Sequence, residues 1–169
     1  MNQSDFLKVV LPFKDKVFRL AKRLLVSTEE AEDATQELFF KLWRNREKLS
    51  DYKNIEAFAM TMTKNYCYDR LKSKQASNLT LVHSNYKEKD TSLDKKLEYR
   101  DSVNQVHKLI EKLPEQQKLI IQFRDVEQYD FDEICKMLDM KATAVRVALS
   151  RARKTIREEL IKQHNYGIS

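Results

Sequence analysis

The chain has 169 residues, of which 34% are charged and 41% hydrophobic, and its formal net charge is +6. A single Gly and two Pro argue against a protein rich in β-turns and favour long helices, so we expect an all-α fold. No apolar run approaches the roughly 18 residues of a membrane-spanning helix and the N-terminus lacks the apolar core of a signal peptide, so we expect a cytoplasmic protein without membrane insertion.

The residues that usually form catalytic or metal sites are few and scattered. Cys67 and Cys135 lack the spacing of a zinc site or a disulfide framework, and the three histidines do not cluster with them. No Gly-rich phosphate loop is present. Asp33 and Glu37, one helical turn apart, could be a metal-binding pair in a helical bundle, but no matching Glu-x-x-His motif accompanies them. We therefore expect no enzymatic activity, no metal and no cofactor.

Two helices are predicted in the first part of the chain. One runs from about Asp5 to Leu25 and is expected to break or kink at Pro12. Its apolar set is Leu7, Val10, Leu11, Val17, Phe18, Ala21, Leu24 and Leu25. Ser27, with Glu30 three residues later, forms a capping box that starts a second helix ending near Arg44. The inner stripe of this helix is Ala31, Ala34, Leu38 and Leu42.

Phe40 is an aromatic residue among polar groups on the other side of the second helix. It lies at helical spacing from Asp33, Glu37 and Arg44. Either another helix of the same domain covers its ring, or the ring contacts a partner protein. Large apolar side chains in a charged surround are enriched at protein interfaces, which favours the partner-binding interpretation.

A polar turn at residues 47–54 leads to a third predicted helix, which ends near Lys74. We expect its core side to consist of Ile55, Ala59, Met62, Tyr66 and Leu71. The remaining faces carry Lys64, Asn65, Tyr68, Asp69, Arg70, Lys72 and Lys74. Aromatic rings can stack on extruded bases while cations hold phosphate, so this pattern suits unpaired nucleic acid. Tyrosines on helix surfaces are also frequent in proteins that bind none.

Residues 75–97 are rich in Ser, Asn, Thr, Lys and Asp and lack a sustained apolar period, so we expect a flexible linker. It would join two small helical domains, 1–74 and 98–163, and a frayed tail would follow at 164–169. The second domain opens with a helix from about Glu98 to Lys112, and Pro114 starts the next. The expected core residues here are Val103, Val106, Leu109, Ile110, Leu119, Ile120 and Phe123.

The second domain is predicted to end in a helix-turn-helix. Asp130, with Glu133 three residues later, caps a short helix, and a turn follows near 139–141, where Asp139 can take the left-handed conformation. The inner stripe of the following helix is Val145, Leu149, Ala152, Ile156 and Leu160. Its other faces are rich in Arg, Lys, Ser and Thr, which suits the DNA major groove. A solvated basic helix in an ordinary bundle is the alternative.

Three motifs in this order resemble the extracytoplasmic-function (ECF) sigma factors, the compact two-domain branch of the sigma-70 family of bacterial RNA polymerase subunits. They are AEDATQELFFKLWR (31–44), AFAMTMTKNYCYDRLK (57–72) and, after the variable linker, LPEQQKLIIQFRDVEQYDFDEICKMLDMKATAVRVALSRARKTIREEL (113–160). The resemblance implies a sigma factor that binds core polymerase and promoter DNA and directs transcription initiation. Residues 1–74 would correspond to sigma region 2 and residues 98–163 to sigma region 4.

The resemblance also implies three sets of contact residues. The residues expected to dock on the clamp coiled coil of the largest polymerase subunit are Asp33, Gln36, Glu37, Phe40 and Arg44. Those expected to melt and hold the minus-ten element, in the segment 49–54 and the third helix, are Tyr52, Asn54, Asn65, Tyr66, Tyr68, Arg70 and Lys72. Those expected to read the minus-thirty-five element are Thr143, Arg146, Val147, Ser150, Arg151 and Lys154. The linker would thread toward the RNA exit path, and an anti-sigma factor is an expected partner.

Two positions depart from the family pattern, which usually has Gly where Asp139 stands and Ser or Thr where Lys141 stands. Both residues affect the conformation of the turn and therefore the angle at which the last helix begins. The alternative function is a stand-alone helix-turn-helix regulator whose N-terminal domain senses a ligand or binds a partner. The first domain shows no obvious heptad for the dimerisation that such a regulator would use.

Overall fold

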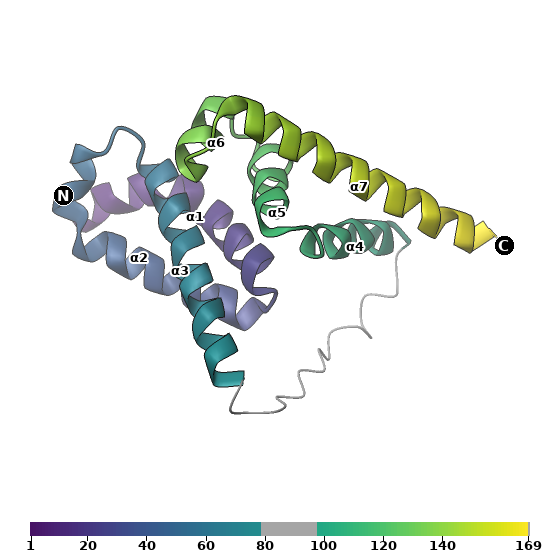
Figure 1. The fold of residues 1–169 in the computed structure, drawn as a ribbon. Coiled ribbons are helices and arrows are strands. Elements are labelled where there is room, and N and C mark those ends of the chain that lie inside the picture. Colours follow the sequence, from purple (N-terminus) through teal and green to yellow (C-terminus); the bar gives the residue numbers. More distant parts are fainter. Residues whose placement is uncertain (79–97, 169) are drawn as a thin grey trace. The chain divides into compact units, whose positions relative to one another are not determined.

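The computed structural model describes residues 1–78 and 98–168, apart from the side chains of residues 76–78, 98–101 and 166–168. Every regular element in the described part of the chain is helical. The chain divides into two compact units, the first built mainly by α1 to α3 and the second mainly by α4 to α7 (Figure 1). The expected all-α class with two helical domains is therefore confirmed.

Helix α1, Gln3–Leu25, is capped at both ends. The Asn2 side chain accepts a hydrogen bond from the backbone N–H of Asp5 at 2.8 Å. Val26 takes a left-handed conformation, with φ 66°, and its N–H bonds to the carbonyl of Lys22. The helix runs through Pro12 without the expected break. Pro12 is exposed, as is Lys8, whose carbonyl loses its usual donor, so water can replace that hydrogen bond.

The core face of α1 differs from the predicted one. Leu7 and Leu11, expected inside, are 40% and 55% exposed. Phe6, Phe13 and Leu20, which the prediction left out, are buried. Three large side chains remove more apolar surface from water than two leucines, and the helix rotation that buries them turns Leu7 and Leu11 toward solvent. Val10, Val17, Ala21, Leu24 and Leu25 are buried as predicted, whereas Phe18 is half-buried.

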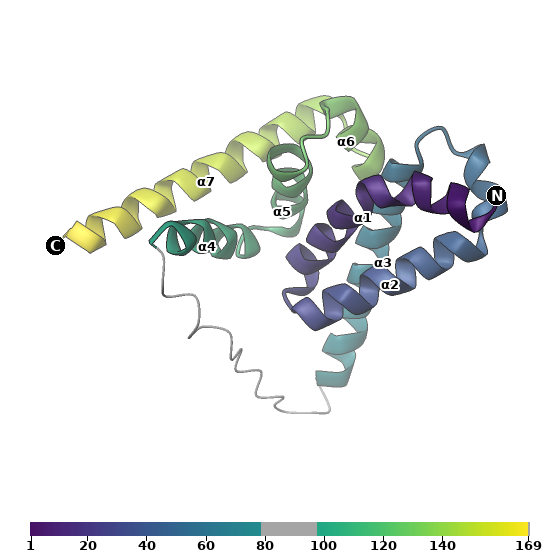
Figure 2. The same ribbon diagram turned by 180° about the vertical axis from the view of Figure 1, so that it is seen from behind.

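Helix α2, Thr28–Arg44, begins where the capping box predicted. The hydroxyl of Ser27 accepts a hydrogen bond from the N–H of Glu30 at 3.3 Å. The predicted inner stripe, Ala31, Ala34, Leu38 and Leu42, is buried throughout. Helices α1, α2 and α3 each contact the other two, so this stripe closes a three-helix core (Figure 2).

The polar turn between α2 and α3 contains a 3₁₀ helix, η1, at Arg46–Asp51, which is anchored by the fully buried Leu49. Helix α3, Ile55–Asn78, begins after Asn54, whose side-chain oxygen accepts a hydrogen bond from the N–H of Ala57 at 3.0 Å. It extends four residues into the expected linker. The rest of that linker lies outside the described residues, and the domain limits stay predictions.

The buried face of α3 also differs from the predicted one. It consists of Ala59, Met60, Thr63 and Cys67, while Ile55, Met62, Tyr66 and Leu71 are half-buried. The Thr63 hydroxyl can enter the core because it donates to the carbonyl of Ala59 at 2.7 Å. Burial raises the pKa of the Cys67 thiol to about 12, so this side chain stays neutral and acts as a small apolar group.

The second unit contains α4 (Glu98–Glu111), α5 (Glu115–Ile121), a π-helical turn η3 (Gln122–Val126), α6 (Phe131–Leu138) and α7 (Ala142–Ile168). Helix α5 packs on α7, and α4 contacts both. The π turn was not predicted. It forms because the N–H of Glu127 bonds to the carbonyl of Gln122 at 3.0 Å, while the two side chains form a buried hydrogen bond of 3.1 Å.

Candidate polymerase-binding and DNA-binding surfaces

The residues expected to bind core polymerase share one outer face of α2. Asp33, Gln36, Glu37, Phe40 and Arg44 follow one another at steps of one, three and four residues, and all five are exposed. Phe40 is 54% exposed, and the guanidinium of Arg44 lies 5.6 Å from the centre of its ring. We call these five residues the α2 face. An exposed ring with charged neighbours is the usual form of an interface anchor.

The neighbouring Phe39 has a different environment. It is half-buried and stacks on Phe13 of α1, with ring centres 6.2 Å apart. Phe39 therefore contributes to the core, whereas the ring of Phe40 makes no such aromatic contact among the described residues. Of the two adjacent phenylalanines, Phe39 packs inside the first unit, whereas Phe40 belongs to its outer surface.

The expected minus-ten residues of α3 lie on two faces of that helix. Asn65, Tyr68 and Lys72 are three and four residues apart and share one side. Asn65 and Lys72 are exposed, while Tyr68 is half-buried. Tyr66 and Arg70, one turn apart, share another side. The structure therefore does not bring all five together.

Tyr66 and Arg70 are already engaged with α2. A guanidinium nitrogen of Arg70 donates to the Tyr66 hydroxyl at 3.5 Å, and the Lys41 ammonium lies 5.0 Å from the centre of the Tyr66 ring. Glu30 pairs with Arg70 at 3.8 Å and with Lys74 at 2.5 Å. These ion pairs reduce the positive charge that this side of α3 offers to a phosphate.

The segment before α3 carries a second aromatic surface. The ring of Tyr52 is exposed and stacks on Phe58 of α3, with ring centres 4.0 Å apart and an interplanar angle of 22°. Sequence reasoning missed Phe58, although its position one turn into the helix was a usable signal. Asn54 lies between them in the sequence, but its side-chain oxygen caps α3. The stack holds the Tyr52 ring in a fixed plane, as base stacking requires.

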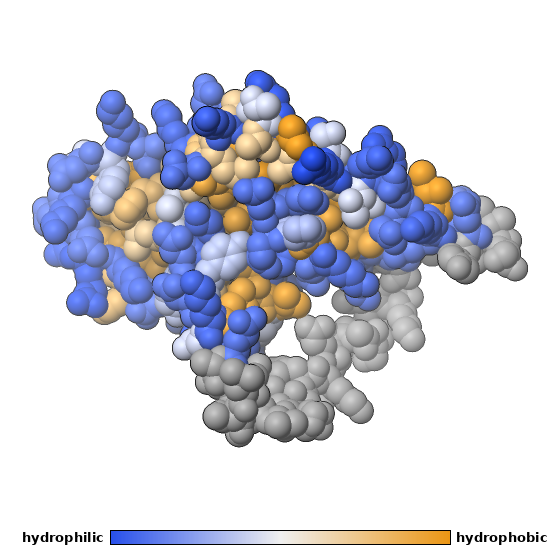
Figure 3. Space-filling model, viewed as in Figure 1, coloured by the Kyte–Doolittle hydropathy of each residue, from blue (hydrophilic) through white to orange (hydrophobic). Residues whose placement is uncertain are grey.

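The residues expected to read the minus-thirty-five element share the outer face of α7. All six are exposed, and Val147 among them is 42% exposed. We call them the α7 face; its members are Thr143, Arg146, Val147, Ser150, Arg151 and Lys154. The opposite side, Val145, Ala148, Leu149 and Ala152, is buried. Figure 3 shows that hydrophilic side chains cover most of the visible surface, with several hydrophobic patches between them.

The turn before α7 has the predicted conformation. Asp139 has φ 52°, in the left-handed region that Gly most readily adopts. Lys141 precedes the first residue of α7, and its carbonyl accepts the N–H of Val145 at 3.0 Å. An ammonium group carries no acceptor, so the Lys141 side chain cannot cap the free N–H groups of the first turn.

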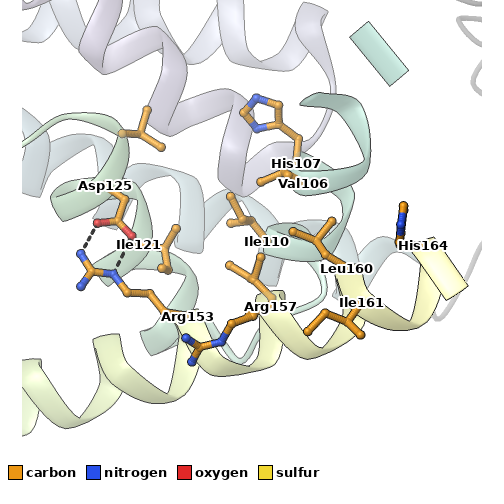
Figure 4. A pocket seen from close by; sticks show the side chains of 12 residues that line it. Val106, His107, Ile110, Ile121, Asp125, Arg153, Arg157, Leu160, Ile161 and His164 are labelled. Carbon is orange, nitrogen blue, oxygen red and sulfur yellow. Dashed lines mark hydrogen bonds and ion pairs between the residues drawn. The ribbon is translucent and has the colours of Figure 1, made fainter. Parts of the chain in front are cut away.

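Arg153 ties α7 to η3 on a further side of the helix. Its Nε donates to Oδ2 of Asp125 at 3.0 Å, and a second nitrogen donates to Oδ1 (Figure 4). These hydrogen bonds raise the pKa of Arg153. The pair borders a hollow of about 600 Å³, whose apolar lining is Val106, Ile110, Ile121, Val126, Ile156, Leu160 and Ile161. Ile156 and Leu160 were predicted to be core residues, but they are half-buried around this hollow.

The part of the chain that the structure describes lacks both a metal-ligand cluster and a membrane-spanning helix. No three His, Cys, Asp or Glu side chains in that part come together as metal ligands. Within the same residues, no helix has the length and the apolar character that crossing a membrane requires.

Comparison with known proteins identifies the family. Residues 9–77 match the family model for Sigma-70 region 2, and residues 104–156 match the one for Sigma-70, region 4. The chain belongs to the sigma-70 family, in its ECF group, and is an RNA polymerase sigma factor. Sigma factors of this family are transcription initiation factors that bind core polymerase and promoter DNA. Both units match a sigma-70 family model. A stand-alone helix-turn-helix regulator would need such a match only in its second, DNA-binding unit.

Individual relatives match over nearly the whole chain. The ECF RNA polymerase sigma factor SigW of Bacillus subtilis is 23% identical over 170 residues, covering 94% of this chain and 90% of that protein. The RNA polymerase sigma-H factor of Pseudomonas aeruginosa is 26% identical over 172 residues, covering 94% and 88%. The sigma factor RpoE from Bartonella quintana, solved with the anti-sigma factor NepR, has a similar fold, with a TM-score of 0.72, 18% identity and coverage of 92% and 96%.

Proposed function

We propose that the two units divide the work of this sigma factor. The first unit docks on core polymerase through the α2 face and holds the melted minus-ten element, and the second reads the minus-thirty-five duplex through the α7 face. The observation that carries this proposal is the α7 face itself. Five exposed side chains with donors, acceptors or positive charge, together with the exposed Val147, lie opposite a buried apolar side, so the helix is fixed from behind while its outer residues stay available for base edges.

We propose that four residues contact the unpaired DNA strand of the minus-ten element: Tyr52, Asn65, Tyr68 and Lys72. Tyr52 has an exposed ring supported by Phe58, and the other three share one side of α3. Tyr66 and Arg70 lie elsewhere and are engaged with α2, so they would support that helix or contact phosphate. Asn54 would act through the capping of α3, which orients the segment that carries Tyr52.

The domain limits belong to this proposal. The first domain was expected to span residues 1–74. A slightly later end is supported by the family-model match, which extends to residue 77, and by α3, which ends at Asn78. The second corresponds to 98–163. We further propose that the chain acts by binding, without chemistry of its own, in the cytoplasm, where its polymerase partner works. Since RpoE was solved with an anti-sigma factor, control by such a partner is part of the proposal.

Reconstituted transcription tests the proposed function. The chain is added to core polymerase of its own organism, and initiation is mapped on a library of genomic promoters. We expect initiation at a defined set of promoters that share minus-thirty-five and minus-ten sequences. Core polymerase without the chain is the control. An identical initiation pattern with and without the chain would contradict the proposal.

A further inference from the structure

Phe131, the first residue of α6, contacts the α7 face. The guanidinium carbon of Arg146 lies 5.1 Å from the centre of the Phe131 ring, and that of Arg124 lies 4.4 Å from it. A cation within about 6 Å of a ring centre is attracted by the negative face of the ring. Arg146, a member of the α7 face, makes such a contact. Its side chain is therefore restrained, although the residue is exposed.

The position of the Phe131 ring is itself set by local hydrogen bonds. Oδ1 of Asp130 accepts from the N–H of Glu133 at 2.8 Å and caps α6 at the residue before the ring. Arg124 donates to the carbonyl of Tyr129 at 3.0 Å, and Gln128 takes a left-handed conformation with φ 63°. These constraints fix the start of α6, and Phe131 is half-buried there. A ring held in this way can act as a fixed support for a mobile side chain.

We propose that Phe131 is a positioning residue for promoter reading, whose ring holds the Arg146 side chain ready for a guanine in the minus-thirty-five element. This inference rests on the proposed role of the α7 face. A bidentate contact with guanine requires one narrow set of Arg side-chain angles, and an unrestrained Arg loses substantial rotamer entropy when it adopts them. A ring that limits these angles before binding lowers this cost.

The expected effect is small and specific. Exposed cation–π contacts contribute about 0.5–1 kcal/mol, which corresponds to a change of about 2- to 5-fold in binding. Because Phe131 acts through Arg146, its loss should reduce discrimination at the base pair that Arg146 reads and leave the other positions unchanged. A purely structural role would instead weaken binding to every sequence by the same factor.

The test uses the full chain bound to core polymerase and a set of promoters with single-base changes in the minus-thirty-five element. Phe131→Leu keeps apolar bulk and removes the aromatic face, whereas Phe131→Tyr keeps the ring. We expect Phe131→Leu to lower discrimination about 2- to 5-fold at the position affected by Arg146→Ala, and Phe131→Tyr to behave as wild type. In the Arg146→Ala background, Phe131→Leu should have no further effect on discrimination.

Three results would overturn the inference: unchanged discrimination in Phe131→Leu, a uniform loss on all sequences, or an equal effect in the Arg146→Ala background. Thermal unfolding of each variant checks the fold, and Phe131→Met replaces Phe131→Leu if the latter unfolds. Failure of the proposed function looks different, because the wild-type complex would then show no preference among the promoters at all. In that case both the function and the inference would be wrong.

Discussion

Phe40 places a large apolar ring on the α2 face, and we propose that it contributes to the complex with core polymerase more than to the free domain. We predict that Phe40→Ala weakens binding to core polymerase by about 2 kcal/mol or more, roughly 30-fold in Kd, and that Phe40→Glu weakens it further. Circular dichroism and a binding titration against core polymerase measure the two effects separately. Phe39→Ala is the matched control, since Phe39 stacks on Phe13 and its loss should lower stability. Normal binding by Phe40→Glu would remove this residue from the interface.

Arg146 and Arg157 are predicted to differ in what they recognise. Arg146 belongs to the α7 face, whereas Arg157 borders the apolar hollow near η3 (Figure 4). Arg146→Ala should relax the choice of base at one position by about 1–3 kcal/mol. Arg157→Ala should weaken binding to all sequences equally or leave it unchanged. Titrations against single-base promoter variants at several salt concentrations distinguish these outcomes. A uniform loss in Arg146→Ala would make Arg146 a phosphate contact and move the base reader to another residue of the α7 face.

At the scale of the element, the start of α6 depends on the charge of Asp130. Hydrogen bonds from the backbone N–H of Glu133 lower the pKa of Asp130 below its ordinary value of 3.8. A carboxyl group with a lowered folded pKa contributes stability that is present above its unfolded pKa and is lost as the pH falls through its folded pKa. We predict that Asp130→Ala lowers the Tm at neutral pH and that the difference from wild type shrinks in strong acid.

Asp130→Asn is the control for this prediction, because its amide oxygen can still accept the cap hydrogen bond without titrating. Its Tm at neutral pH should lie between those of wild type and Asp130→Ala, because Asn keeps the acceptor and lacks the charge. The difference between wild type and Asp130→Ala should be followed by calorimetry from neutral to acid pH. A difference that stays constant as the pH falls would show that the charge of Asp130 does not matter to the cap.

The elements differ in how well the sequence predicted them. Caps were predicted correctly at Ser27, Asp130 and Asp139, because a cap depends on neighbours within a few residues. The rotation of α1 and α3 was predicted incorrectly, because burial of Phe13 or Thr63 depends on packing between distant segments. The same limit applies to the surfaces. Helical spacing predicted the α2 and α7 faces, but the contact of Phe131 with Arg146 joins two helices and has no local signal.

At the scale of the whole molecule, most of the charge excess lies in α7 and the residue before it. Residues 141–162 carry seven Lys or Arg and two Glu, while the whole chain has a net charge of +6. A concentrated positive charge on the helix that we propose reads DNA would make binding depend on released counterions. Binding of the polymerase complex to its promoter should therefore weaken steeply as salt concentration rises.

Lys154, on the α7 face, offers a direct measure of this dependence. We predict that Lys154→Ala lowers the slope of log affinity against log salt by about one and changes no base preference. Lys8→Ala on α1 removes the same charge from an exposed position of the other unit and is the control; its slope should equal that of wild type. Equal slopes for all three proteins would mean that Lys154 does not contact phosphate.

The division of α7 into two sides also bears on how promoter preference diverges among related proteins. Val145, Leu149 and Ala152 hold the helix in place, and none of them belongs to the α7 face. Substitutions at Ser150 or Arg151 would therefore alter the outer surface of α7, which we propose faces DNA, without repacking the core. Mutations that change which promoters are recognised can accumulate here at little cost in folding stability, so a duplicated copy of such a chain can acquire a new set of target genes in few mutational steps.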